Sequence, residues 1–326
     1  MRYRVLGRTG LKVSELGVGG HEYRRPLPTT LGRWGEVDME KFVRTQPERT
    51  RLIKRAIDAG ANYFDPTHIE EVKSLGSALK ELGVKEDTHV SIMILGLFGK
   101  MAESSRSKWR QIIIDDVEEK LKSLQMDYAD ILTILFPERN YSPERLTAAL
   151  EVFSELKEEG GIGFFGASTH EPRFLAELMR RHDCFDMVMV RYNYHLQEAH
   201  DAIFPLAKAL EVGVVVIKPF AWPYYGIPFM RFGPVEAEEG PYTPAQTGLH
   251  WILKSPEVST VVAGMNSQAE LEENQTAFTK EGQIDEGLLD RYLKAAQSTQ
   301  GKQKLRKMLS DPAVDIRFFA ERALSE

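Results

Sequence analysis

Acid–base side chains gather in the stretch FDPTHIEEVKSLGSALK, residues 64–80, between a short apolar run and the pattern of an amphipathic helix. A histidine has an unperturbed pKa of about 6.5, so His68 could transfer a proton near neutral pH, and Asp65 could orient it. We therefore take Asp65 and His68 as candidate catalytic residues. The alternative for His68 is a helix cap or a solvated loop. Glu70 and Glu71 fit the first helical turn, where negative charge is favourable.

The elements that must position this cluster repeat one unit: an apolar run, a loop and an amphipathic helix. The apolar runs lie at 16–20, 61–64, 89–95, 128–135, 163–168, 186–192, 213–218 and 259–264. Helical patterns lie between them, one of them over 202–213, and several end in glycine, as helices commonly do. Short strands that alternate with helices in this number predict an α/β fold, a (β/α)₈ TIM barrel. A doubly wound open sheet is the alternative, but the first strand here reads only GVGGHE where such folds carry a glycine-rich turn.

The two ends of the chain extend this barrel. The opening YRVLGRTGLKVSELGVGG predicts a β-hairpin with its turn at Gly7–Gly10. We expect the barrel to span residues 1–280 and a C-terminal helical extension, 281–326, to pack on it. The connections 21–48 and 219–242 are long and follow strands, which places them at the C-terminal mouth, where barrel active sites form. They are expected to wall a substrate pocket.

Composition narrows the class of protein. Apolar content of 42% and charged content of 28% are ordinary for a soluble enzyme, and the net charge of −6 disfavours nucleic acid or an anionic membrane as partner. The single cysteine, Cys184, excludes an intramolecular disulfide and a cluster held by several thiolates. The sequence shows neither a signal-peptide core at its start nor an apolar run long enough for a membrane span. We expect a cytoplasmic protein.

Several segments together resemble the aldo/keto reductase superfamily. They are RVLGRTGLKVSELGVGG, ANYFDPT, SLGSALK, SLQMDYADIL, GFFGASTH, VVVIKPFA and TVVAGMNSQAELEEN, in the family's order over about residues 3–280. The resemblance implies an oxidoreductase that binds NAD or NADP across the barrel mouth and acts on a small carbonyl or alcohol substrate. It also implies a catalytic aspartate, tyrosine, lysine and histidine, in which the tyrosine donates a proton to the substrate oxygen.

Only one of these catalytic residues is present at its matching position. Asp65 matches the aspartate, but DPTHIEEVKSLG is two residues shorter than the family's pattern and has no tyrosine, so that slot falls near His68. The positions of the lysine and the histidine hold Leu95 and Leu135. A tyrosine-based proton relay cannot operate here, and the floor of the mouth is expected to be apolar. The resemblance thus implies a divergent active site, with His68 as the proton donor supported by Asp65.

The cofactor segments match the family better. Ser168 and Thr169 stand where the family holds the nicotinamide carboxamide, whereas Met189 replaces a glutamine. Glu270 stands where members that prefer NADPH carry an arginine, so the resemblance favours NAD. The remaining cofactor-binding positions implied by the resemblance are Lys218, Pro219, Phe220, Gly264, Met265, Asn266, Glu273 and Asn274.

Other residues extend the site or offer alternatives. His21, Glu22, His170 and Tyr224 are expected to line the substrate pocket. His21, Glu22 and His170 could also join Asp65 and His68 around a metal, but the spacing matches no compact motif, and we predict none. Lys218 or Lys100 could replace the missing cation, and Tyr224 or Tyr225 could supply a phenol. The alternatives to an oxidoreductase are a non-catalytic NAD(P)-binding barrel and a different, metal-assisted reaction on the same barrel.

Overall fold

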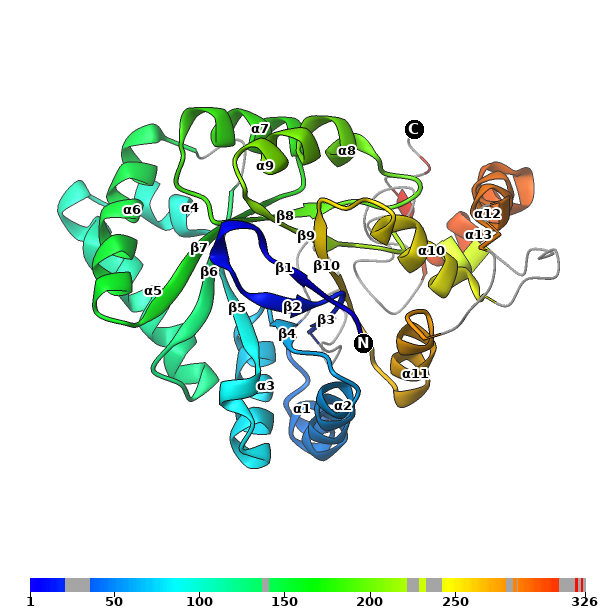
Figure 1. The fold of residues 1–326 in the computed structure, drawn as a ribbon, viewed down its shortest axis with the longest axis horizontal. Coiled ribbons are helices and arrows are strands. Elements are labelled where there is room, and N and C mark those ends of the chain that lie inside the picture. Colours follow the sequence, from blue (N-terminus) through cyan, green and yellow to red (C-terminus); the bar gives the residue numbers. More distant parts are fainter. Residues whose placement is uncertain are drawn as a thin grey trace.

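Parallel strands close into a barrel in the order β10-β3-β4-β5-β6-β7-β8-β9 (Figure 1). The computed structural model describes residues 1–20, 36–136, 141–221, 229–232, 242–279, 284–285, 287–310, 320–321 and 324. The strands are β3 (Leu16–Gly19), β4 (Tyr63–Asp65), β5 (His89–Ile94), β6 (Ala129–Leu135), β7 (Ile162–Thr169), β8 (Met187–Arg191), β9 (Gly213–Ile217) and β10 (Val258–Ala263). Each overlaps an apolar run of the sequence, so the predicted (β/α)₈ barrel is confirmed.

Helices surround the strands (Figure 1). The α-helices are α1 (Met39–Arg44), α2 (Gln46–Asp58), α3 (Ile69–Leu82), α4 (Leu97–Ala102), α5 (Trp109–Leu124), α6 (Pro143–Glu158), α7 (Pro172–Arg181), α8 (Glu198–Ala202), α9 (Phe204–Ala209), α10 (Pro244–Leu253), α11 (Gln268–Thr276), α12 (Gly287–Gln297) and α13 (Thr299–Met308). Short 3-10 helices are η1 (Gly7–Thr9), η2 (Lys85–Asp87), η3 (Arg106–Lys108) and η4 (Phe229–Phe232). The helical pattern over 202–213 corresponds to α9, which starts at Phe204 with Pro205 in its first turn, where a residue without an N–H is tolerated. The short helix α8 precedes it and ends at Ala202.

The predicted hairpin closes one end of the barrel. Its strands β1 (Tyr3–Val5) and β2 (Lys12–Ser14) pair antiparallel and lie across the barrel in Figure 1. Leu6 and Val13 are fully buried and join the cluster of apolar side chains inside the barrel. Gly7 has a φ of +48°, and a Cβ atom there would lie 2.1 Å from the Gly213 nitrogen, so the turn can approach β9 only with glycine at this position.

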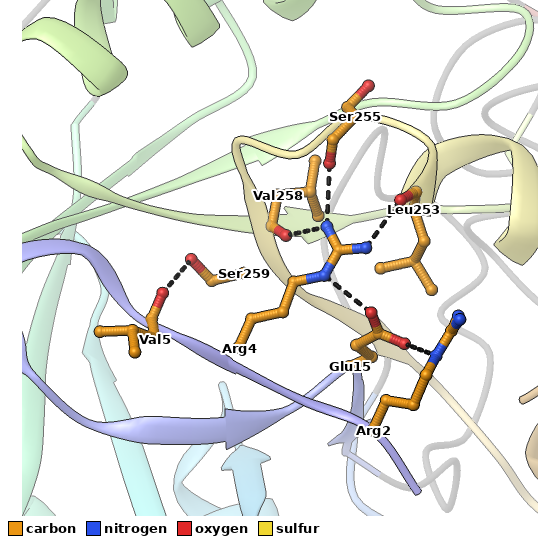
Figure 2. A network of polar contacts seen from close by, with 8 residues as sticks. All are labelled: Arg2, Arg4, Val5, Glu15, Leu253, Ser255, Val258 and Ser259. Atoms are coloured by element: carbon orange, nitrogen blue, oxygen red, sulfur yellow. Dashed lines mark hydrogen bonds and ion pairs between the residues drawn. The ribbon is translucent and has the colours of Figure 1, made fainter.

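A charged network fastens the hairpin to the end of α10 and the start of β10. Figure 2 shows the Arg4 guanidinium between Glu15 and three backbone carbonyls. It donates to Glu15 Oε1 at 2.7 Å, Leu253 O at 2.7 Å, Ser255 O at 2.9 Å and Val258 O at 2.8 Å. Glu15, only 4% exposed, also accepts from Arg2 at 2.7 Å. The positive charge therefore neutralises a buried carboxylate and bonds carbonyls from the end of α10 to the start of β10.

We expect Arg4→Lys to lower the free energy of unfolding by about 1–2 kcal/mol, because an ammonium group cannot reproduce the planar fork of donors. The matched control is Arg2→Lys, since Arg2 is largely exposed and contacts only one Glu15 oxygen, so its effect should stay below about 0.5 kcal/mol. Urea unfolding of both variants measures the difference. Equal midpoints for the two variants would contradict the anchoring role of Arg4.

The C-terminal helices lie outside the ring of barrel helices. In Figure 1, α12 and α13 stand beside α10, at the edge of the molecule. Phe229 of η4 packs in one apolar cluster with Leu288, Leu289 and Tyr292 of α12. Among the helices that the structure describes, none combines the length and the apolar character needed to cross a membrane.

Candidate active site

Asp65 is the last residue of β4 and is 5% exposed. Its Oδ1 atom is buried and has no hydrogen-bond partner within the described part of the chain. Burial raises the pKa of this carboxyl to about 7, and the negative charge of Glu71 adds to the rise, whereas Lys120 and Lys218 oppose it. A buried carboxyl that exchanges its proton near neutral pH is typical of a functional site, because a purely structural position would pair it.

The floor beside Asp65 is apolar, as the sequence predicts. Leu95 and Leu135 pack on the apolar cluster inside the barrel, together with Ile217 of β9. The two leucines therefore leave no charged side chain at the positions where the family carries lysine and histidine.

Tyr63, two residues before Asp65 on β4, does not replace the missing tyrosine. It belongs to the same interior cluster and is fully buried. Burial, with a further contribution from the charge of Asp65, raises its pKa well above the usual value. A phenol held this way is a weaker acid than a free one.

The turn after Asp65 is held from two helices. His68 is half-buried and is the N-cap residue of α3, which agrees in position with the helix-cap alternative. Glu71 Oε2 accepts the backbone N–H of Thr67 at 2.9 Å and that of His68 at 3.3 Å. On the other side of the Thr67–His68 peptide group, Lys120 Nζ of α5 donates to Thr67 O at 2.9 Å.

Lys120 is a site residue that the sequence analysis missed. It is 8% exposed and lies on the buried face of α5, in line with Ile113, Val117 and Leu124. Burial lowers its pKa to about 8, although four surrounding carboxylates, with Glu71 the strongest, favour the charged form. A lysine on the apolar stripe of an otherwise amphipathic helix was the signal that could have identified it.

Basic side chains stand at the ends of the strands opposite β4. His170 follows β7, Arg191 ends β8 and Lys218 follows β9. Burial, together with the charges of Lys218 and Arg191, lowers the pKa of His170 to about 4, so His170 is neutral at pH 7. The charge of Lys218 acts on both His170 and Asp65, which shows that these ends converge at one mouth.

Lys218 also has an unusual backbone, with a φ of +60°. The buried Asn193 holds the chain there: its Nδ2 donates to Lys218 O at 2.8 Å and to Ala221 O at 2.9 Å. Pro219 is buried and Phe220 half-buried, with the Phe220 ring 6.3 Å from that of Phe229. Asn193 thus fixes the segment that the resemblance assigns to the cofactor, and the sequence analysis did not single it out.

Ser168 can bond a ligand at the position where the resemblance implies the nicotinamide carboxamide. Its Oγ atom is buried and has no hydrogen-bond partner within the ranges that the structure describes, so a carboxamide could satisfy it. Thr169 Oγ1 instead accepts the N–H of Glu171 at 3.2 Å. Met189 lies in the barrel interior and is fully buried.

The carboxylate of Glu270 already occupies the start of α11. Glu270 Oε2 accepts the N–H of Asn266 at 2.7 Å, so a phosphate at this N–H would have to displace a carboxylate. Gly264 is exposed, whereas the Met265 side chain is buried. Asn274 is 4% exposed, and the backbone carbonyl of Glu273 accepts from Gln246 Nε2 at 2.8 Å.

Several expected pocket residues lie outside the described residues: His21, Glu22, Tyr224 and Tyr225. Lys100 is described, and it pairs with Asp116 of α5. Within the ranges given above, histidine, cysteine and carboxylate side chains form no group of three or more that could hold a metal ion.

Comparison with known proteins agrees with this geometry. The model of the aldo/keto reductase family matches residues 30–224. L-galactose dehydrogenase of Arabidopsis thaliana is 26% identical over 85% of this chain and 88% of its own length. A probable voltage-gated potassium channel subunit beta of Oryza sativa subsp. japonica is 24% identical over 85% of this chain and 91% of its own. The holo form of an aldo-keto reductase from Bacillus halodurans superposes with a TM-score of 0.65 at 22% identity, covering 91% of this chain and 97% of that one.

Proposed function

Because the chain belongs to the aldo/keto reductase family, we propose that it is an oxidoreductase that uses NAD(H) to interconvert a small carbonyl compound and the corresponding alcohol. The observation that carries this proposal is the Asp65 carboxyl, which is buried at the end of β4 with an unpaired oxygen and a pKa of about 7. A group of this kind can give up a proton in the reducing direction and take it back in the oxidising direction.

Reduction of a carbonyl needs a hydride, which a bound nicotinamide supplies, and a proton, which the protein must supply. In the proposed reaction, protonated Asp65 donates to the substrate oxygen, and His68 is the second polar group on the same turn. The apolar floor of Leu95 and Leu135 excludes water beneath the reacting carbonyl. This arrangement replaces the tyrosine, lysine and histidine that the family ordinarily uses.

The residues proposed to hold the cofactor are those that the resemblance implies. Ser168 would bond the carboxamide, since its buried hydroxyl has no partner within the described chain. Lys218 would contact the phosphates from the segment that Asn193 fixes. Glu270 favours NAD over NADP, because its carboxylate at the start of α11 repels a 2′-phosphate.

We expect Glu270→Arg to tighten NADPH binding by about tenfold while changing NADH binding by less than about threefold, because an arginine attracts the 2′-phosphate that the carboxylate repels. Fluorescence titration of both dinucleotides measures the two dissociation constants. Glu272→Arg is the matched control: it lies on the same helix, where Glu272 pairs with Arg55 at 3.2 Å, and it should not alter the NADH-to-NADPH ratio. Similar shifts in both variants would contradict a specific role of Glu270.

The test of the function itself is a cofactor titration followed by turnover assays on aldehydes, dicarbonyls and keto sugars. Binding of NADH together with reduction of at least one class supports the proposal. Binding without turnover would instead support the non-catalytic NAD(P)-binding barrel, a candidate favoured by the missing catalytic residues and by relatives that carry the name of a channel subunit. A failure to bind either dinucleotide would contradict both.

A further inference from the structure

The Asp65–His68 turn is contacted by a cation from outside the barrel interior, Lys120 of α5. The family's lysine position holds Leu95, and this leucine packs among apolar side chains. The described residues nevertheless contain a lysine that contacts the turn: Lys120 reaches Thr67 from the helix layer, and its charge acts on Asp65. We propose that Lys120 is the positioning residue of this site and supplies, through the Thr67 carbonyl, the cation that is missing at the end of β5, where Leu95 stands. This inference rests on the proposed function.

Two opposite charges hold the two backbone polar groups of Thr67. The Thr67 N–H donates to Glu71 at 2.9 Å, and the Thr67 carbonyl accepts from Lys120 at 2.9 Å. Hydrogen bonds to charged groups are stronger than those between neutral groups. Because Thr67 lies between Asp65 and His68, fixing its two polar groups limits the freedom of both side chains.

The packing of α3 against α5 brings Lys120 within reach. Gly76 of α3 lies directly against α5: a Cβ atom there would come within 2.2 Å of Leu124 O. The close approach places the buried face of α5 beside the start of α3, where the Asp65–His68 turn ends. The Glu71 carboxylate lies against Gly20, the residue after β3, because a Cβ atom there would come within 2.0 Å of Glu71 Oε2.

The charge of Lys120 depends on carboxylates from two helices and acts on one from the barrel. Asp116 and Glu119 of its own helix and Glu70 and Glu71 of α3 favour its charged form, and Asp116 is itself paired with Lys100 of α4. Toward the barrel, Lys120 faces Asp65, on which Lys218 also acts. Loss of the Lys120 charge should therefore loosen the turn and raise the pKa of Asp65.

The test compares Lys120→Met, Lys120→Arg and the matched control Lys122→Met, which removes an exposed lysine from the same helix. We expect Lys120→Met to lower kcat by about tenfold or more with KM changed by less than about threefold, because a group that orients the turn acts on the reaction step more than on substrate binding. The pH at which its reduction rate halves should move upward by on the order of half a unit or more. Lys120→Arg should restore most of kcat, and Lys122→Met should match the wild type.

A second readout needs no substrate, so it separates this inference from the proposed function. In NMR spectra, Lys120→Met should shift the amide signals of Thr67 and His68 and the titration of the His68 ring. Lys122→Met should leave these signals as they are in the wild type. In the wild type, the two amide signals should move between pH 7 and pH 9, as Lys120 loses its proton near pH 8. This titration remains available if Lys120→Met does not fold. Unchanged signals in the variant, or amide signals that do not move in that pH range, would overturn the inference, even if the variant is less stable.

Discussion

Replacing Asp65 with asparagine is expected to stabilise the protein by roughly 3 kcal/mol at pH 8 and by less than about 1 kcal/mol near pH 4.5. The carboxyl has a pKa of about 7 in the folded protein, against 3.8 as its ordinary value. Between these two values the folded state holds a proton that the unfolded state has released. The free energy of unfolding therefore falls as the pH rises through this window, and above about pH 7 the whole loss is present.

The size of the expected stabilisation follows from the shift in the pKa of Asp65. About three pKa units correspond to about 4 kcal/mol, and the buried amide of asparagine, which also lacks a partner, returns about 1 kcal/mol of this. Urea unfolding at pH 4.5, 6 and 8 measures the difference. Asp87→Asn, at an exposed carboxylate of η2, is the control and should show no pH-dependent gain. If Asp65→Asn is no more stable than the wild type at pH 8, the carboxylate is compensated and our account of the site fails.

The same substitution is expected to reduce turnover by about 10²- to 10⁴-fold, the usual contribution of a general acid or base. Stability and activity should thus change in opposite directions, as is common where a strained or unpaired group serves function. For the wild type, carbonyl reduction should fall as the pH rises through about 7, because Asp65 then loses the proton it must donate. Alcohol oxidation should rise over the same range.

Two further variants identify the proton donor. Because Asp65 is the proposed donor, His68→Ala should lower turnover less than Asp65→Asn. A loss at least as large as that of Asp65→Asn would assign the donated proton to His68. Tyr63→Phe is the matched control on the same strand, because the Tyr63 side chain is fully buried in the interior cluster, and it should retain turnover within about threefold. A large loss of turnover in Tyr63→Phe, together with an active Asp65→Asn, would identify Tyr63 as the proton donor and contradict our assignment.

The barrel, the hairpin and the apolar floor could all be predicted from the amino-acid sequence. Apolar runs and helical periodicity record which side of each element is buried, and eight such units in alternation leave one common architecture. Leu95 and Leu135 could be placed in the floor because residue type alone decides whether a side chain carries charge. The short helix α8 was not among the predicted helices, because five residues are too few to show a helical period.

The electrostatics of the site, by contrast, depend on how distant parts of the chain pack together. Asp65 and His68 were visible as a pair, but the raised pKa of Asp65 depends on how completely neighbouring elements bury it. Lys120 lies 53 residues from Thr67 in the chain, and only the packing of α3 on α5 brings the two together. Residue types and local periodicity fix which elements form, whereas a pKa depends on every charge within a few ångströms, whichever element supplies it.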